Sequence, residues 1–225
     1  MSPRAIAQAA LDHGLDLIAV ADHNTAGMVD VVAQAAADAG LAFLYGMELQ
    51  TREEVHLLAY FDEPAACHGF AAEIYRLLPD HPNEPAFFGD QVVVDLDETI
   101  LRTEPKLLLN SLDLGFDEAV RSIRDHGGLA IPAHVDRETF GLIAQLGFPP
   151  AELSFEFVEA ISGHLPDGFG AAQVICSSDA HTPGQIGRRR TLFGVKEVSI
   201  EEMIKAARQI DGRSVRCESI ERRET

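Results

Sequence analysis

The sequence is poor in basic residues, and this shortage limits the partners that the protein can have. Lys and Arg together number 18 against 36 Asp and Glu, which gives a formal net charge of -18. Such a chain repels a phosphate backbone over most of its surface, so we expect extended nucleic acid to be a poor partner. A small phosphorylated substrate is compatible with this charge, because bound divalent cations would invert the field inside a site.

The sequence also lacks paired cysteines, long apolar runs and a signal segment. Its three cysteines, Cys67, Cys176 and Cys217, lie far apart and form no Cys-x-x-Cys motif. This usage is typical of reduced thiols in a cytoplasmic protein. No run approaches the roughly 18 apolar residues of a membrane span, and the N-terminus has no charged-then-apolar pattern. We therefore expect a cytoplasmic protein with no membrane segment.

What the sequence does contain is an alternation of short apolar runs and helical patterns. With 225 residues and 46% hydrophobic content the chain can bury one sizeable core, so we expect a single domain over residues 1–225. The alternation predicts an α/β fold with a mainly parallel sheet, either closed or doubly wound. The predicted helices are 2–11, 28–39, 64–78, 116–125, 138–146 and 200–210, and the predicted strands are 15–21, 41–45, 55–61, 91–97, 129–131, 154–161 and 173–176. An insert at about 79–106 interrupts this order, and the charged tail beyond residue 210 is expected to fray.

Polar side chains follow four of the predicted strands, at the point where each strand ends. They are His23, Glu48, His134 and the pair Asp179 and His181. Residues two apart in an extended chain project to the same side, so the last two could aim a carboxylate and an imidazole at one point. Four polar clusters at four strand ends favour a closed barrel, because a barrel brings every carboxyl end to one face.

One further histidine, His56, lies inside an otherwise apolar strand, where it must have a hydrogen-bond partner or a metal. The gathered side chains offer nitrogen and oxygen ligands and no sulfur. This set suits Zn, Mn or Fe, and one carboxylate could bridge two metals. The candidate metal ligands are His23, Glu48, His56, His134, Asp179 and His181.

These residues occur in short sequence motifs that resemble those of the PHP (polymerase and histidinol phosphatase) family. The motifs are Ala21-Asp22-His23-Asn24, Gly46-Met47-Glu48, Ala133-His134 and Ser178-Asp179-Ala180-His181, together with the later His56. They appear in the order of the family from residue 21 to 181. The resemblance implies a distorted (β/α)7 barrel, two or three divalent metal ions in a complete site, and hydrolysis of phosphoric esters. Carried over residue by residue, it makes the six candidates metal ligands, with Glu48 as the bridge, and assigns catalysis to Asp179, His181 and Glu48.

The start of the sequence departs from the family pattern. PHP proteins usually open with a strand that ends in His-x-His, followed shortly by a further Asp or His ligand, whereas this sequence begins after that point, at Ser2-Pro3. We therefore expect the first strand and up to three ligands to be missing. Either the start is misassigned, in which case the DNA upstream of the Met1 codon encodes this strand, or part of the site has been lost.

Three further residues have alternative interpretations. Asp22 either orients His23 or caps the next helix. Arg137 either binds a substrate phosphate bidentately or is solvated at the start of a helix. Arg188 belongs to the basic run 188–190 and is a candidate substrate contact, although such runs are more often solvated loops. The histidines without a strand-end context are interpreted as structural or surface residues, namely His13, His68, His81, His126 and His164.

The leading functional hypothesis is a phosphomonoesterase-like, metal-dependent phosphoesterase, in which a metal-bound hydroxide attacks phosphorus. A second hypothesis is a degenerate barrel that acts as a binding or regulatory module, because the first metal motif is absent. Metal-dependent amide hydrolysis on a related barrel ranks lower. It would need a carbamylated lysine at a strand end, and Lys106 is the sole lysine between residues 1 and 195.

Overall fold

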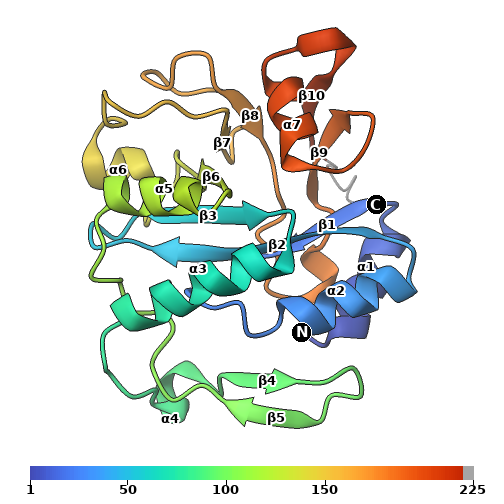
Figure 1. Cartoon of the computed structure of the whole chain (residues 1–225), viewed down its shortest axis with the longest axis vertical. Helices are drawn as coiled ribbons and strands as arrows, with labels where there is room; N and C mark the ends of the chain where they lie inside the picture. The colour runs from blue at the N-terminus through green and yellow to red at the C-terminus, as the bar shows by residue number, and fades with distance from the viewer. Residues whose placement is uncertain (220–225) are drawn as a thin grey trace, which may run out of the picture.

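The central sheet of the protein, described by a computed structural model for residues 1–219, has the strand order β1-β2-β3-β6 (Figure 1). Its strands are β1 (Leu17–Val20), β2 (Ala42–Gln50), β3 (His56–Phe61) and β6 (Leu129–Pro132). β1 is parallel to β2, whereas β3 is antiparallel to both β2 and β6. A short turn joins β2 to β3, and such a connection forces an antiparallel pair. The end of β2, the start of β3 and the end of β6 therefore meet at one edge.

The remaining strands form three two-stranded sheets. β7 (Phe157–Glu159) is parallel to β8 (Gln173–Ile175), β9 (Arg189–Gly194) is antiparallel to β10 (Ser214–Ser219), and β4 (Val92–Val94) is antiparallel to β5 (Ile100–Thr103). The mixed α/β class is confirmed, but the mainly parallel arrangement is wrong. The predicted (β/α)7 barrel is not confirmed, because residues 1–219 form separate short sheets and no closed one. Within residues 1–219, β1 pairs with β2 and with no other strand.

The longer helices follow the predicted pattern closely. They are α1 (Pro3–Asp12), α2 (Val29–Asp38), α3 (Pro64–Leu77), α5 (Phe116–Asp125) and α7 (Ile200–Ala207). In α5 the buried residues are Phe116, Ala119, Val120 and Ile123, which is the i, i+3, i+4, i+7 spacing of one helix face. The short elements are α4 (Pro85–Phe88), α6 (Leu142–Leu146) and the 3-10 turns η1 (Pro183–Gln185) and η2 (Ile210–Gly212).

Three local predictions are corrected by the structure. The helix expected over 138–146 is confined to α6, because Phe140 has a left-handed backbone with φ 60° that a helix cannot contain. The strand expected over 154–161 shrinks to β7. The tail expected to fray forms β10 as far as Ser219 because it pairs with β9, and the rest of that tail, 220–225, lies outside the described residues.

The prediction of three reduced thiols is wrong for two of them. Cys176 and Cys217 form a disulfide across 41 residues of sequence, with their Cα atoms 5.4 Å apart. β10 contacts β8, and this packing brings the two cysteines together. Their spacing in the sequence does not predict the disulfide. Cys67 is free and buried in α3, and burial raises the pKa of its thiol to about 12.

The core lies on both faces of the central sheet. One face packs against α3 and α5 through fully buried residues such as Phe61, Phe70 and Phe116. The other packs against α7 through Leu58, Ile131 and Met203. Residues 79–106 contain α4 and the β4–β5 hairpin, which lie together at the bottom of Figure 1. Among the described helices none has the length and apolar character needed to cross a membrane.

Candidate metal centre

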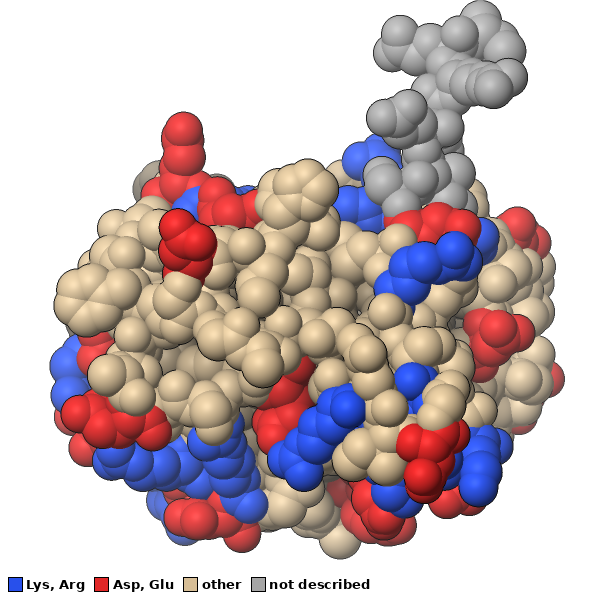
Figure 2. Space-filling model, turned by 90° about the horizontal axis from the view of Figure 1, so that it is seen from above, with Lys and Arg blue, Asp and Glu red and all other residues tan. Residues whose placement is uncertain are grey.

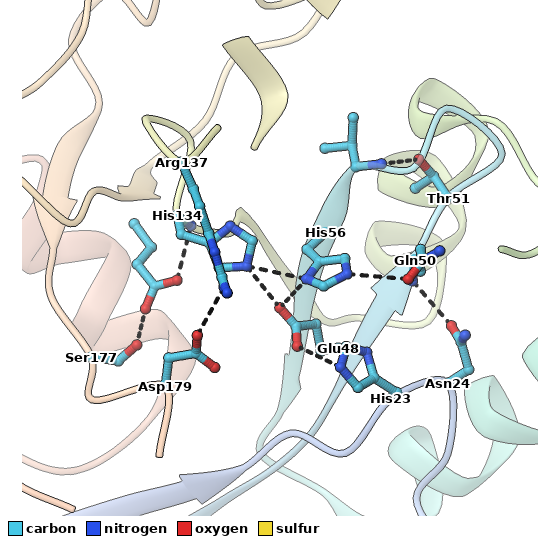
Figure 3. A network of polar contacts seen from close by, with 12 residues as sticks. His23, Asn24, Glu48, Gln50, Thr51, His56, His134, Arg137, Ser177 and Asp179 are labelled. Carbon is cyan, nitrogen blue, oxygen red and sulfur yellow. Dashed lines mark hydrogen bonds and ion pairs between the residues drawn. The ribbon is translucent and has the colours of Figure 1, made fainter. Parts of the chain in front are cut away.

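Three of the predicted ligands meet at the shared edge of the central sheet (Figure 3). Glu48 lies near the end of β2, His56 is the first residue of β3, and His134 follows the end of β6. The register pairs His56 with Gln50, two residues beyond Glu48 on the same strand face. The backbone N–H of Ala133 donates to the carbonyl oxygen of His56, which places His134 beside it. The three side chains thus come together through the antiparallel pairing of β2, β3 and β6, whereas the sequence analysis expected the ends of parallel strands to bring them together.

The spacing of their ligand atoms suits one metal ion. Oε1 of Glu48 lies 3.0 Å from Nδ1 of His56 and 3.3 Å from Nε2 of His134, and the two nitrogens are 3.1 Å apart. Tetrahedral ligands with bonds of about 2.0–2.1 Å are about 3.3–3.4 Å from one another. All three side chains are buried, with residue exposures of 7%, 6% and 3% in sequence order. We find the donor set and its geometry compatible with Zn, Mn or Fe.

The hydrogen bonding of His56 leaves a nitrogen lone pair directed at this point, and two further imidazoles have a ring nitrogen without a partner. Nε2 of His56 lies 3.3 Å from Oε1 of Gln50, an oxygen that can only accept, so the ring proton belongs on Nε2 and the lone pair on Nδ1. Nδ1 of His134 and Nδ1 of His23 are buried without a hydrogen-bond partner in residues 1–219. Buried polar atoms are rarely left in this state unless a ligand or ordered water completes them.

His23 lies at the margin of this cluster. Its Nε2 is 3.7 Å from Oε2 of Glu48, the carboxylate oxygen that faces away from the other two histidines. The backbone around it continues β1 as an isolated parallel bridge between His23 and Glu48, and the N–H of Asn24 donates to the carbonyl oxygen of Glu48 at 2.8 Å. Glu48 therefore has one oxygen toward each side, which is the arrangement expected of a bridging carboxylate.

The electrostatics of the centre favour a bound cation. Burial alone would raise the pKa of Glu48, but the close contacts of its carboxylate with His134 and His56 outweigh burial and hold that pKa well below its usual range. Burial would lower the pKa of His134, yet the hydrogen bond to Glu48 raises it. Burial lowers the pKa of His23 in spite of the nearby Glu48. The centre therefore keeps an ionised carboxylate among imidazoles, where it attracts either protons or a metal.

The structure does not bring Asp179 and His181 into the three-residue cluster. Asp179 has a left-handed backbone with φ 44°, and its Oδ2 accepts a hydrogen bond from Nη1 of Arg137 at 3.1 Å. The side chain of His181 is 71% exposed, and its Nδ1 lies 3.0 Å from the carbonyl oxygen of Asp179. Because the chain is not extended at residue 179, the rule that residues two apart share a side does not apply there.

The positions of Asp22 and Arg188 differ from what the sequence suggests. In residues 1–219 no hydrogen bond joins the Asp22 carboxylate to His23, and α2 begins seven residues later, so Asp22 does not cap it. The carboxylate lines a cavity instead, and burial raises its pKa. Arg188 is exposed and does not line the cavity, whereas its neighbour Arg189 does.

Two residues of the centre were missed by the sequence analysis. Glu159 is 5% exposed, accepts from the backbone N–H of His134 at 2.9 Å and from the hydroxyl of Ser177, and has its pKa raised by burial. Gln50 accepts from His56 and donates to Oγ of Ser111 at 2.9 Å. The signal for Glu159 is a carboxylate inside an apolar strand, which is costly to bury without a function or a partner.

The centre opens onto a cavity of about 600 Å³. His23, Glu48, Glu159, Asp179 and His181 line its polar end. The rest of its wall combines apolar residues of β1, β3, β6, β7 and β8 with further polar residues such as Asp22, Ser178 and Arg189. A cavity of this size with a few convergent polar groups is typical of a small-molecule site.

Comparisons with known proteins agree with this fold and place part of the chain in a family. The family model described as PHP-associated matches residues 172–210, which include Asp179 and His181. A search of curated protein sequences found no match to the chain. The structure of the lesion-specific endonuclease PfuEndoQ from Pyrococcus furiosus is similar with a TM-score of 0.66 at 18% identity, over 96% of this chain and 53% of that one. The chain thus spans about half the length of that endonuclease.

Two further solved structures share the fold. One is Endonuclease Q in complex with a 27-mer duplex that carries an abasic lesion at the active site, with a TM-score of 0.67 at 18% identity over 95% of this chain and 53% of that one. The other is a "putative metal-dependent phosphoesterase" from Bifidobacterium adolescentis, with a TM-score of 0.50 at 19% identity over 81% of this chain and 83% of that one.

The expectation that extended nucleic acid is a poor partner is contradicted by these comparisons. Endonuclease Q, which has this fold, binds duplex DNA with the lesion at its active site. Net charge averages over the whole surface, whereas binding depends on the local field and on bound cations. The formal charge of -18 therefore excludes less than the sequence analysis inferred.

The match to the PHP-associated family, the shared fold and the gathered Glu48, His56 and His134 agree with the resemblance inferred from the sequence motifs. Residues 172–210 of the chain match the PHP-associated family model, and the chain shares its fold with Endonuclease Q and with the phosphoesterase structure from Bifidobacterium adolescentis.

Proposed function

We propose that this protein is a metal-dependent hydrolase that cleaves phosphoric esters. The observation that carries the proposal is the buried cluster of Glu48, His56 and His134, whose ligand atoms lie 3.0 to 3.3 Å apart beside a cavity of about 600 Å³. A metal held there would polarise the phosphoryl group and lower the pKa of a bound water. His23, Asp179 and His181 are our candidates for further ligands when substrate and metal are both present.

The protein's own residues then have separate tasks. Gln50 fixes the tautomer of His56 through Nε2, so that Nδ1 keeps its lone pair. Glu159 accepts from the backbone N–H of His134 and holds the turn in which His134 has φ 27°. Arg137 neutralises Asp179 through one of its five donors, and the remaining donors are available to a phosphoryl oxygen.

A second candidate activity is cleavage of a phosphodiester in damaged DNA. It is favoured by the fold shared with Endonuclease Q over 95% of this chain. Figure 2 shows acidic and basic residues intermixed on the drawn face. Cations bound in the site would contribute to holding the phosphate backbone of DNA against this mixed surface.

The experiment that tests the proposal combines elemental analysis with two substrates. The purified protein is loaded with Mn, Zn or Fe and assayed on a set of phosphomonoesters and on a duplex that contains one abasic site. We expect about one metal per protein or more and hydrolysis that a chelator abolishes. Chelation should also lower the melting temperature, because a metal bound only by the native state stabilises it by about 2.7 kcal/mol when present at 100 times its Kd.

The outcome decides between the functional hypotheses. Hydrolysis of monoesters alone supports a phosphomonoesterase, and cleavage of the lesion duplex supports a nuclease. A protein that binds less than one metal and hydrolyses neither substrate contradicts the proposal and leaves the binding or regulatory module as the better hypothesis.

A further inference from the structure

The basic run 188–190 divides into three arginines with different surroundings. Arg188 is exposed. Arg190 donates from Nε to Glu218 at 2.6 Å and from Nη1 to the carbonyl oxygen of His13 at 3.2 Å, so its guanidinium is committed to holding β9 against β10 and the end of α1. Arg189 is half-buried and has no ion pair within residues 1–219.

The alternation of β9 directs Arg189 toward the site. Arg189, Thr191 and Phe193 lie on one face of the strand because successive residues alternate. Oγ1 of Thr191 donates to the carbonyl oxygen of Cys176 at 2.9 Å, and the ring of Phe193 packs edge-on against Phe157 at 5.8 Å. Both contacts are to residues of the cavity wall, Cys176 and Phe157, and this face of β9 contributes to the same wall.

Arg189 lines two adjoining cavities. The large cavity of about 600 Å³ also contains Glu48 and Asp179 in its wall. The small one, of about 10 Å³, lies between Arg189, His134, Glu159 and Ser177 and is the size of about one water molecule. Arg189 therefore lines the same enclosure as Glu48 and His134 of the candidate metal centre.

The cavity is lined by several carboxylates, so an anionic substrate would require a cationic side chain to bind there. The carboxylates of Glu48, Glu159 and Asp179 line it, and Asp179 is the one that has an arginine partner, Arg137. An anionic substrate group entering here meets like charges unless a cation receives it. Arg presents a planar fork of donors that matches two oxygens of a phosphoryl group, and it stays charged at any working pH.

We propose that Arg189 forms an anion subsite of the cavity and binds the phosphoryl group of the substrate. This inference rests on the proposed phosphoesterase function, and it names the oxyanion as the part of the substrate that the site recognises. It also replaces Arg188 as the basic-loop residue in contact with substrate.

The test measures binding of inorganic phosphate by titration calorimetry, first without metal and then with the metal loaded. We expect Arg189→Met to weaken phosphate binding roughly tenfold or more, since loss of one charge-assisted contact of about 1.4 kcal/mol corresponds to a factor of ten. Arg189→Lys should retain part of the binding, because it keeps the charge and loses the fork. Arg188→Met is the matched control and should bind phosphate as the unchanged protein does.

The result is independent of whether hydrolysis is found. Circular dichroism and metal content of Arg189→Met should equal those of the unchanged protein, which separates loss of the subsite from loss of the fold or of the metal. Equal phosphate affinity in Arg189→Met and Arg188→Met overturns the inference, and so does an unchanged protein that binds no phosphate. Where hydrolysis is measurable, Arg189→Met should raise KM for the ester more than it lowers kcat.

Discussion

Two clusters in this protein are each centred on a buried glutamate but differ in how completely their polar atoms are paired. The C-terminal charge network consists of Glu202, Arg213 and Lys205. Arg213 donates a bidentate pair of hydrogen bonds to Glu202, from Nε to Oε2 and from Nη2 to Oε1, both at 2.9 Å. Lys205 adds a bond at 3.0 Å, and the backbone N–H of Lys196 adds another at 3.1 Å. Both carboxylate oxygens are therefore used twice. In the metal centre, Glu48 meets imidazoles, and Nδ1 atoms of His23 and His134 have no partner within residues 1–219.

The difference in pairing gives a criterion that distinguishes a structural charge cluster from a functional one. A saturated network has no remaining capacity for a ligand, and its contribution is to tie α7 to the turn before β10. An unsaturated cluster keeps lone pairs, opens onto a cavity and lies where the backbone is strained, as at His134 with φ 27°. Burial of carboxylates alone does not distinguish the two.

The largest expected effect comes from removing a member of the metal centre. We expect His134→Ala to lower metal affinity and hydrolysis by more than about 100-fold, since loss of an outer partner alone costs 10–100-fold. The fold should persist, because the change removes an imidazole and leaves the sheet intact. The exposed His164→Ala is the control. Unchanged metal content in His134→Ala would show that the cluster is not the metal site.

A smaller effect is expected when a supporting residue of the centre is changed. Gln50→Leu removes the acceptor that fixes the His56 tautomer, and we expect metal affinity to fall by about 10–100-fold. Gln50→Glu keeps an acceptor at this position and should retain most of the affinity. Equal losses in both variants would mean that Gln50 acts through packing and not through the His56 proton. Titration with Co or Zn measures the affinity directly.

Breaking the saturated network should affect stability and not chemistry. Arg213→Met leaves the Glu202 carboxylate without its main partner, so we expect the melting temperature to fall by several degrees. Metal affinity per folded protein should be unchanged. Arg208→Met, which removes an exposed ion pair with Glu156, is the control and should shift the melting temperature little. A loss of metal binding in Arg213→Met would contradict the separation of the two clusters.

The smallest effect is a pH dependence of the same network. Hydrogen bonds from Arg213 and then from the N–H of Lys196 lower the pKa of Glu202 from its ordinary 4.5 to about 2. The folded state therefore releases this proton more readily than the unfolded state, so the stabilisation is present above pH 4.5 and is lost as the pH falls from 4.5 toward 2. Urea unfolding at several acidic pH values measures it. Arg213→Met should flatten this part of the curve, and a curve identical to that of the unchanged protein would contradict the assignment.

The part of the site that could be predicted from the sequence is the part that local rules control. Glu48 and His134 follow apolar runs, and His56 stands inside one, so each was found without knowledge of the fold. Asp179 and His181 were expected to point together because an extended chain was assumed, and the left-handed backbone at Asp179 removes that assumption. Gln50 and Glu159 were missed because their roles depend on strand register and on contacts across the sheets.

By itself the sequence determined where the longer helices and the strands of the central sheet form and which polar side chains end the apolar runs, because propensity and periodicity act between near neighbours. The tertiary structure decided everything that depends on residues distant in the chain. It set the antiparallel register that brings His56 to Glu48, the contact of Glu159 with His134, the disulfide between Cys176 and Cys217, and the choice of Arg189 over Arg188 at the cavity. Such contacts are fixed only when loops close and the core packs, and no local pattern in the chain encodes them.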